Sequence, residues 1–380
     1  MEPGRGTVEG VGMNWTNRRV FVTGHTGFKG GWLSLWLQQK GAELCGLSLE
    51  PPTPVNLFQD AGVASGMRSL IGDIRDNGLL RKTLAEHRPE IVFHLAAQPL
   101  VRASHQDPLG TYATNVMGTA NLLDAVRHTD SVRAVIVVTT DKCYENREWV
   151  WPYRESDRLG GFDPYSNSKA CAEMVVSAYR NSFFNPEDYA RHGVAVASVR
   201  AGNVIGGGDW AEDRLVPDIV RAFIDGRSVR IRNPRAIRPW QHVLEPLRGY
   251  IQVAESLYDA GVGYGEAWNF GPEQSDAQPV EWIVKELAAI WGQGAHWELE
   301  GTPQPHEAQN LQLDWSKAAG RLGWRPQLRL KEALALTAAW YLAKLENKDM
   351  RLGTCDQIQH YEDCLQSVAI TNSQNSEVQA

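Results

Sequence analysis

Two side chains with acid–base chemistry stand one helical turn apart in the segment Tyr165-Ser166-Asn167-Ser168-Lys169. Residues four positions apart lie on the same face of a helix, so Tyr165 and Lys169 are expected to be neighbours. A nearby ammonium favours the phenolate and lowers a tyrosine pKa that is normally about 10. Such a phenolate can take a proton from an alcohol while hydride leaves the same carbon. The alternative is a surface tyrosine beside a solvated lysine.

A second group of reactive types, Thr140, Asp141 and Lys142, directly follows the apolar run 134–138. Doubly wound α/β enzymes bind ligands at the carboxyl ends of their strands, so these side chains are expected in a catalytic site. The alternative interpretation is a polar loop in which Asp141 caps a turn.

Three glycines, Gly24, Gly27 and Gly30, follow the apolar run 19–22 and precede a helical pattern at 30–40. Missing side chains permit a tight turn and let a phosphate approach the backbone at a helix N-terminus. A plain strand-to-helix turn would show a similar glycine pattern. Because a strand, this loop and a helix follow one another, the segment predicts a dinucleotide pyrophosphate site.

These groups require a scaffold that brings strand ends together, and the first half of the chain provides one. Short apolar runs typical of buried parallel strands alternate with segments of helical periodicity. Strands are expected at 20–22, 44–47, 91–95, 134–138 and 194–199, and helices at 30–40, 77–87, 114–128 and 166–185. This alternation predicts an α/β fold with a doubly wound parallel Rossmann sheet.

After residue 202 the pattern changes, because Gly206-Gly207-Gly208 and several prolines interrupt it. We expect a Rossmann domain at 14–202, with a return to the sheet at about 240–272, and a smaller lobe at 203–239 and 273–350. Further helices are predicted at 215–226, 280–291 and 330–345. Residues 1–13 are expected to be a flexible extension, and the polar end of segment 351–380 is expected to be disordered.

Three further sets of residues have two readings each. His94 ends a predicted strand and is interpreted as a structural histidine rather than a catalyst. Asp73 is a candidate for the adenine amine of a dinucleotide, although an N-cap role for Asp73 or Asp76 fits equally. A run of arginines can be a solvated face or can bind phosphate oxygens through guanidinium forks. It comprises Arg227, Arg230, Arg232, Arg235 and Arg238.

Composition narrows the class of protein. The chain has 380 residues, 43% of them hydrophobic and 22% charged, and a net charge of −7. This acidity disfavours nucleic-acid and anionic-membrane partners, and no apolar stretch reaches the about 18 residues of a membrane span. The five cysteines are scattered without metal-site spacing. We therefore expect a cytoplasmic enzyme without a metal site.

Together these motifs resemble the extended short-chain dehydrogenase/reductase family, in its NAD-dependent epimerase/dehydratase branch. The resemblance runs from about Asn14 to Leu365. It is carried by TGHTGFKGGWLSLWL from Thr23, HLAAQPLVR from His94, TNVMGTANLLDAVR from Thr114, TTDKCYEN from Thr139, DPYSNSKACAE from Asp163, RAGNVIGGGDWAEDRLVPD from Arg200 and RPWQHVLEPLRGY from Arg238.

The resemblance implies a set of functional residues. Catalysis would rest on Thr140, Asp141, Lys142, Tyr165 and Lys169. The nucleotide sugar would be held by Asn203, Arg214 and Arg238, with Arg230 and Arg232 as further phosphate candidates. NAD would be bound by Gly24, Thr26, Gly27, Phe28, Lys29, Gly30, Asp73, Ile74, Leu95, Ala96, Ala97, Gln98, Tyr165 and Lys169.

The implied reaction is the dehydration of CDP-glucose by oxidation at C4, loss of water across C5 and C6 with Asp141 as the acid, and hydride return to C6. Lys142 stands where the dTDP-glucose branch has a glutamate base, so the C5 base is Lys142 or Glu145. His105 and Gly31 replace an expected tyrosine and serine. The expected assembly is a homodimer or tetramer formed through helices 114–128 and 166–185.

Alternative functions remain open on the sequence. A dTDP- or GDP-sugar dehydratase or a 4-epimerase would keep Tyr165 and Lys169, although an epimerase has no use for Asp141 as an acid. A regulator that binds NAD without turnover belongs to another class, but such proteins usually lose the Tyr/Lys pair.

Overall fold

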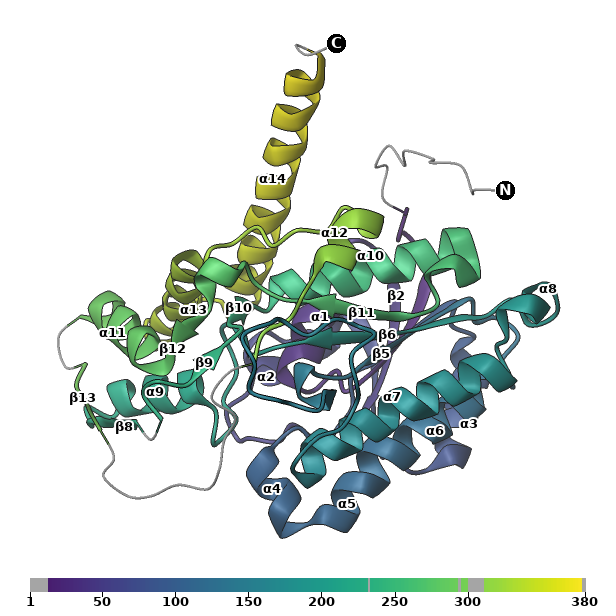
Figure 1. Ribbon diagram of the computed structural model, residues 1–380, viewed down its shortest axis with the longest axis horizontal. Helices are drawn as coiled ribbons and strands as arrows, with labels where there is room; N and C mark the ends of the chain where they lie inside the picture. The colour runs from purple at the N-terminus through teal and green to yellow at the C-terminus, as the bar shows by residue number, and fades with distance from the viewer. Residues whose placement is uncertain (1–12, 232, 293–294, 300–310, 378–380) are drawn as a thin grey trace.

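A single seven-stranded parallel sheet forms the centre of the molecule (Figure 1). The computed structural model describes residues 13–231, 233–292, 295–299 and 311–377. The strand order is β11-β6-β5-β4-β1-β2-β3, and every neighbouring pair is parallel. The strands are β1 (Arg19–Thr23), β2 (Glu43–Ser48), β3 (Met67–Ile71), β4 (Ile91–His94), β5 (Ala134–Val138), β6 (Ala195–Ala201) and β11 (Ala267–Phe270).

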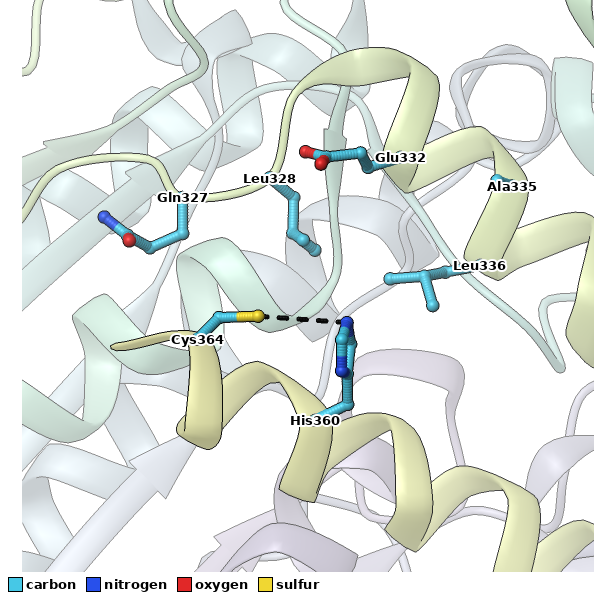
Figure 2. A pocket seen from close by; sticks show the side chains of 7 residues that line it. All are labelled: Gln327, Leu328, Glu332, Ala335, Leu336, His360 and Cys364. Carbon is cyan, nitrogen blue, oxygen red and sulfur yellow. Dashed lines mark hydrogen bonds between the residues drawn. The ribbon is translucent and has the colours of Figure 1, made fainter. Parts of the chain in front are cut away.

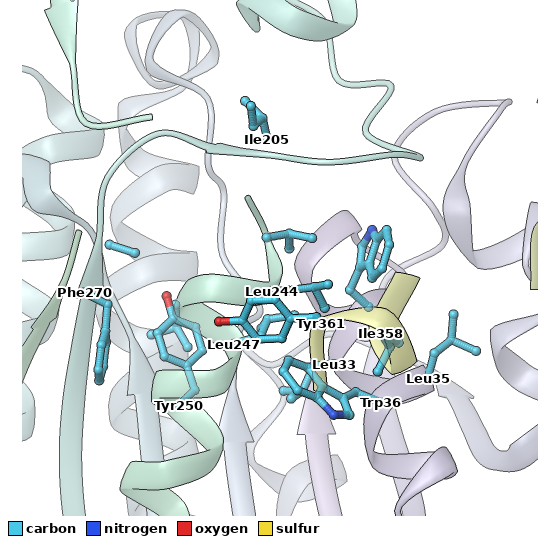
Figure 3. Packing of buried hydrophobic residues seen from close by; sticks show 14 of the residues in the cluster. Leu33, Leu35, Trp36, Ile205, Leu244, Leu247, Tyr250, Phe270, Ile358 and Tyr361 are labelled. Carbon is cyan, nitrogen blue, oxygen red and sulfur yellow. The ribbon is translucent and has the colours of Figure 1, made fainter. Parts of the chain in front are cut away.

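Helices cover both faces of this sheet, which explains why the strands are continuously apolar. Val20 and Val22 enter one hydrophobic cluster, whereas Phe21 between them enters another. The first cluster includes α1 (Phe28–Gln39), α10 (Leu244–Ala260) and α14 (Met350–Glu377), whose packing is shown in Figure 3. The second includes α3 (Asn77–His87), α6 (Gly118–Val126) and α7 (Pro164–Ser182). The predicted doubly wound α/β fold is confirmed.

The chain after residue 202 adds short two-stranded sheets and further helices to the central sheet. Three two-stranded pairs are β7 (Val204–Ile205) with β10 (Gln241–His242), β9 (Ile237–Arg238) with β12 (Gln278–Pro279), and β8 (Val229–Ile231) with β13 (Trp297–Leu299). The helices are α9 (Leu215–Ile224), α11 (Val280–Trp291), α12 (Ser316–Leu322) and α13 (Leu330–Leu345). Between these segments the chain returns to the large sheet as β11.

Several elements differ from the expectations. The long helix α10 was not predicted, and neither were the short helices α2 (Leu57–Asp60), α4 (Val101–Gln106), α5 (Pro108–Tyr112), α8 (Tyr189–His192) and α12. The expected helix 114–128 begins with a π-helical segment, Ala113–Met117, and ends at Val126. Helix α14 extends to Glu377, where disorder was expected, and its first half is held by buried Ile358 and Tyr361. Residues 1–12, expected to be flexible, lie outside the described residues.

No helix in the described part of the chain combines the length and the apolar character needed to cross a membrane.

Candidate active site

The glycine-rich loop joins β1 to α1 at the centre of the sheet, between the strands β4 and β2 that flank β1. Gly24 has φ +81°, and a Cβ there would lie 2.7 Å from the Ala96 nitrogen. A Cβ on Gly30 would lie 2.0 Å from the Gly24 carbonyl oxygen. Gly27 is the N-cap of α1 and supplies no side-chain hydrogen bond to the first turn. The first N–H groups of α1 are therefore available to an anion.

The segment that follows β4 lies against this loop. The Ala96 N–H donates to Thr23 Oγ1 over 3.2 Å, and the Gln98 N–H donates to Asn115 Oδ1 over 2.8 Å. The side chains of Leu95, Ala96, Ala97 and Gln98 are half-buried. Strand order reverses between β1 and β4, which is where doubly wound sheets bind nucleotides.

The other residues expected around the cofactor differ in their burial and in their hydrogen-bond partners. Asp76, not Asp73, is the N-cap of α3 and accepts from the Leu79 N–H. Asp73 pairs with Arg75 over 2.5 Å, and the hydrogen bond from that guanidinium lowers the pKa of the Asp73 carboxyl. Ile74 is buried. Thr26 Oγ1 lies 2.7 Å from Ser48 Oγ, and half-buried Phe28 faces Gly206.

Tyr165 and Lys169 lie in the first two turns of α7, and both are buried. Asp163 caps the helix and Pro164 occupies its first turn, so the sequence sets where the helix begins. The Lys169 ammonium donates to the Val138 carbonyl over 3.1 Å. Burial lowers the pKa of Lys169 to about 8. The interpretation of the pair as a solvated surface feature is wrong.

The phenol of Tyr165 differs from the sequence-based expectation in one respect. Burial raises its pKa to about 12, although a hydrogen bond with Thr140 acts in the opposite direction. The expected lowering is therefore absent in the protein chain by itself, because loss of hydration outweighs the favourable contacts of the phenolate.

Asp141 is buried at the carboxyl end of β5, in the single 3-10 turn Asp141–Cys143. Thr140, not Asp141, is the N-cap of this turn, and Thr140 Oγ1 donates to Asp141 Oδ1 over 2.9 Å. Asp141 Oδ2 is buried and has no hydrogen-bond partner among the described residues. Burial raises the pKa of this carboxyl, although Lys142 opposes the shift. Asp141 is thus suited to carry a proton.

Cationic side chains surround Asp141 and Tyr165. Lys29, half-buried at the start of α1, is within electrostatic reach of Asp141, Lys169 and Arg214. Burial and the neighbouring cations lower the pKa of Lys29 to about 7. Arg214 influences the Tyr165 phenol, and buried Arg238 influences the Asp141 carboxyl. The structure therefore brings together residues from the glycine loop, β5, α7 and the smaller lobe.

One of the arginines proposed for phosphate contact, Arg230, lies away from the groups around Asp141 and Tyr165 and is bound to another residue. Arg230 pairs with Glu298 over 3.1 Å, and its side chain is 73% exposed. Arg232 lies outside the described residues. Asn203 is half-buried between β6 and β7, and its carbonyl accepts from the Gln241 N–H over 3.0 Å.

Sequence reasoning missed two buried acids beside these groups. Asp209 pairs with Arg214 over 2.8 Å, and Glu173 pairs with Arg200 over 2.8 Å. The available signal for Glu173 was its position four residues after Lys169 on the same helix. For Asp209 no spacing in the sequence indicates the partner.

Three residues with open interpretations are now placed. His94 is buried, and its ring nitrogens lie 2.7 Å from Thr23 Oγ1 and 3.2 Å from Thr119 Oγ1, so it is structural as expected. His105 is exposed at the end of α4. A Cβ on Gly31 would lie 2.9 Å from Leu57 Cδ2, so a serine there would require Leu57 to move.

A separate hollow of about 350 Å³ lies between α13 and α14 (Figure 2). Cys364 Sγ lies 3.8 Å from His360 Nε2 at its wall. None of the predicted site residues lines it. Across the described residues, no group of three or more His, Cys, Asp or Glu side chains is arranged to hold a metal ion.

A doubly wound sheet with a glycine loop at its centre and a buried Tyr/Lys pair on one helix defines an extended short-chain dehydrogenase/reductase. Within that class, the sequence model of the GDP-mannose 4,6 dehydratase family matches residues 21–337. The chain belongs to this family.

Comparison with individual proteins gives the same class. The chain is 56% identical over 347 residues to the CDP-glucose 4,6-dehydratase of Salmonella typhimurium, covering 91% of this chain and 97% of that protein. It is 28% identical over 341 residues to a dTDP-glucose 4,6-dehydratase of an Actinoplanes species, covering 86% and 98%.

Solved structures share the fold. A UDP-glucose 4-epimerase from Thermotoga maritima, solved with UDP-glucose, superposes with a TM-score of 0.72 at 24% identity, over 86% of this chain and 99% of that one. A dTDP-glucose 4,6-dehydratase from Streptomyces venezuelae, solved with NAD, gives 0.71 at 24% identity, over 88% and 99%.

Proposed function

We propose that this protein is a CDP-glucose 4,6-dehydratase that converts CDP-glucose to CDP-4-keto-6-deoxyglucose with NAD as a resident cofactor. The observation that carries the proposal is a buried carboxyl of raised pKa, Asp141, beside the Tyr165–Lys169 pair. This arrangement supplies a proton donor for water loss next to a base for alcohol oxidation. The relative that is 56% identical has this activity by name.

The glycine loop fits the dinucleotide. Gly24 and Gly30 lie too close to their neighbours to carry a side chain, so the backbone of the loop is not covered by side chains at these two positions. The start of α1 has no side-chain cap and offers N–H groups to a pyrophosphate. NAD, when bound, supplies a hydride acceptor for C4 of the sugar and a donor for C6. Residues 95–98 would lie along the cofactor, and Asp73 and Ile74 would lie at its adenine end.

Tyr165 is the proposed base for the C4 hydroxyl. Its phenol is oriented by the hydrogen bond with Thr140, and Lys169 adds positive charge on the same helix face. Thr140 thereby connects the oxidising pair to Asp141, because it also donates to Asp141 Oδ1 over 2.9 Å. One threonine thus fixes the base for oxidation relative to the acid for elimination.

Asp141 is the proposed acid that protonates the departing C6 hydroxyl, while a base takes the C5 proton. Of the two bases that the sequence leaves open, we propose Lys142. Glu145 accepts an ion pair from Arg158 over 2.9 Å and its side chain is 40% exposed. Lys142 directly follows Asp141 in the turn after β5, and a lysine in its neutral form can accept a proton. The C5 proton would pass to the Lys142 amine, and water would leave with the Asp141 proton.

Substrate binding is proposed to rest on Asn203, Arg214 and Arg238. Arg214 acts electrostatically on Tyr165 and Arg238 on Asp141, and guanidinium groups suit a diphosphate. Arg230 is directed to Glu298 instead, so its proposed contact with phosphate would require that pair to open.

Incubation with CDP-, dTDP-, UDP- and GDP-hexoses, followed by mass spectrometry, tests the proposal. Loss of one water from CDP-glucose is expected. Water loss from another nucleotide sugar alone would make the protein a different dehydratase, and isomerisation without water loss would make it a 4-epimerase. Binding of NAD without any turnover would indicate the regulator.

We further propose that the protein is a homodimer or a pair of dimers in the cytoplasm. Large apolar side chains are exposed on the helices expected at the interface: Met117 is 55% exposed and Met174 on α7 is 54% exposed. Light scattering at micromolar concentration tests the assembly, and a monomer would contradict it. The five cysteines are unpaired, in keeping with a reducing compartment.

A further inference from the structure

A buried ion pair lies one helical turn beyond Lys169, and the proposed mechanism does not use it. Glu173 follows Lys169 by four residues on α7, so the two side chains share a helix face. Arg200 on β6 donates to both carboxylate oxygens of Glu173, through Nε over 2.8 Å and Nη2 over 2.9 Å. The Glu173 side chain is 3% exposed and the Arg200 side chain is 4% exposed. Complete burial of a charged pair is costly, so its retention calls for a reason.

The same pair holds both ends of the turn that carries Asp141. Thr139 Oγ1 donates to the Glu173 carboxylate over 2.5 Å, and Ser198 Oγ donates over 2.6 Å. Arg200 Nη1 donates to the Tyr144 hydroxyl over 2.7 Å. Thr139 precedes the segment 140–143 and Tyr144 follows it. Through these bonds the network fixes the segment with the proposed acid against the helix with the proposed base.

Glu173 is also the acidic residue with the largest electrostatic effect on Lys169. The carboxylate counteracts the loss of Lys169 protonation that burial causes. Burial favours the neutral acid of Glu173, but Arg200 holds the pKa of Glu173 below its ordinary value, so the carboxyl is ionised. The titratable groups that face Lys169 are Lys29 from α1, His94 from β4, Cys143 from the turn after β5, and Tyr165 and Glu173 from α7.

Of these groups, only Glu173 is an anion at neutral pH among the described residues. Burial lowers the pKa of His94 to about 3 and raises that of the Cys143 thiol, so both are neutral. Lys29, whose pKa is lowered to about 7 mainly by burial, disfavours a second cation when it is protonated. Among these groups, the Glu173 carboxylate is therefore the counter-charge of the Lys169 ammonium.

We propose that Glu173 is a positioning residue that acts through Lys169, as the fixed counter-charge of its ammonium, and that Arg200 holds Glu173 in place. The inference rests on the proposed function, because it assigns Lys169 to the oxidation step. Rates are therefore recorded with whichever nucleotide sugar the wild-type protein turns over. If that sugar is not CDP-glucose, the proposed function fails while the role of Glu173 is still tested.

The test is the pH dependence of kcat for Glu173→Gln, with thermal melting as a check of folding. The active form needs Lys169 protonated, so rate is lost on the alkaline side as Lys169 loses its proton. Without the carboxylate, Lys169 loses its proton at lower pH, and the alkaline limb should move down by about one pH unit or more. An unchanged limb with a uniformly lower rate would overturn the proposal, because a purely structural role predicts that result.

Three further variants keep the proposal falsifiable if Glu173→Gln folds poorly. The double variant Glu173→Gln/Arg200→Gln leaves no unpaired buried charge, and its alkaline limb should still be displaced. Glu173→Asp keeps the charge and should restore the wild-type limb. Tyr144→Phe loosens Arg200 without touching the carboxylate, so its limb should match wild type. A displaced limb in Tyr144→Phe, or a wild-type limb in the double variant, would refute the role of Glu173.

Discussion

Replacing Asp141 by asparagine separates the two halves of the proposed reaction. The amide keeps the shape of the carboxyl and can accept the hydrogen bond from Thr140, but it cannot protonate a departing hydroxyl. The variant should therefore still oxidise C4 and then stall before water is lost. A single positioned acid contributes about 10²- to 10⁴-fold in rate, which corresponds to about 3–5 kcal/mol of activation free energy.

The assay is quantitative mass spectrometry of the sugar nucleotide after reductive trapping of the ketone with deuterated borohydride. In Asp141→Asn, the trapped species should be a 4-keto sugar that retains its C6 oxygen, and product should form at least about 100-fold more slowly. Product formation at the wild-type rate would refute the assignment of Asp141 as the acid. Loss of C4 oxidation as well would show that Asp141 is needed earlier in the cycle.

The same substitution should raise the thermal stability of the folded protein at neutral pH, because Asp141 is buried. Because the folded pKa of this carboxyl is raised, native protein binds a proton that unfolded protein releases as pH rises above the ordinary aspartate range. Each pKa unit of difference costs the wild type about 1.4 kcal/mol once the pH exceeds the folded pKa. Asparagine does not titrate, so the variant should melt at a higher temperature than wild type at neutral pH. The gap should shrink in acid, and equal melting at all pH values would contradict the raised pKa.

Three other outcomes are expected. Tyr165→Phe should lower turnover by about 10²- to 10⁴-fold while the dissociation constant of NAD, measured by fluorescence, stays near wild type; wild-type turnover would remove Tyr165 from the mechanism. Lys142→Met should abolish exchange of the C5 hydrogen with deuterated solvent, whereas Glu145→Gln should retain it, and the reverse pattern would make Glu145 the base. Arg238→Ala should raise KM for the nucleotide sugar about tenfold or more. Arg230→Ala should change KM little, because Arg230 is exposed and paired with Glu298. Equal effects of the two variants on KM in steady-state kinetics would contradict the different placement of the two arginines.

Local patterns allowed much of the fold to be predicted. Helix α3 begins and ends where its periodicity predicts, because Asp76 caps its start and Arg88, in the left-handed conformation, caps its end. The glycine loop and the Tyr165–Lys169 spacing are also local features, since a turn or one helix face depends on residues a few positions apart. The α/β class followed from the alternation of such segments. The short helix α5 was missed although Asp107 accepts from the Gly110 N–H over 2.8 Å, because five residues provide too little periodicity.

The sequence by itself determined the parallel sheet, the dinucleotide loop and the residue types of the site, because each depends on short-range spacing. Only the tertiary structure decided the chemical state of those residues, because burial and opposite charges come from segments far apart in the chain. The raised pKa values of Tyr165 and Asp141 and the choice of Arg238 over Arg230 follow from that packing. The pairing of Glu173 with Arg200 likewise joins a helix to a strand, and only the folded chain brings the two together.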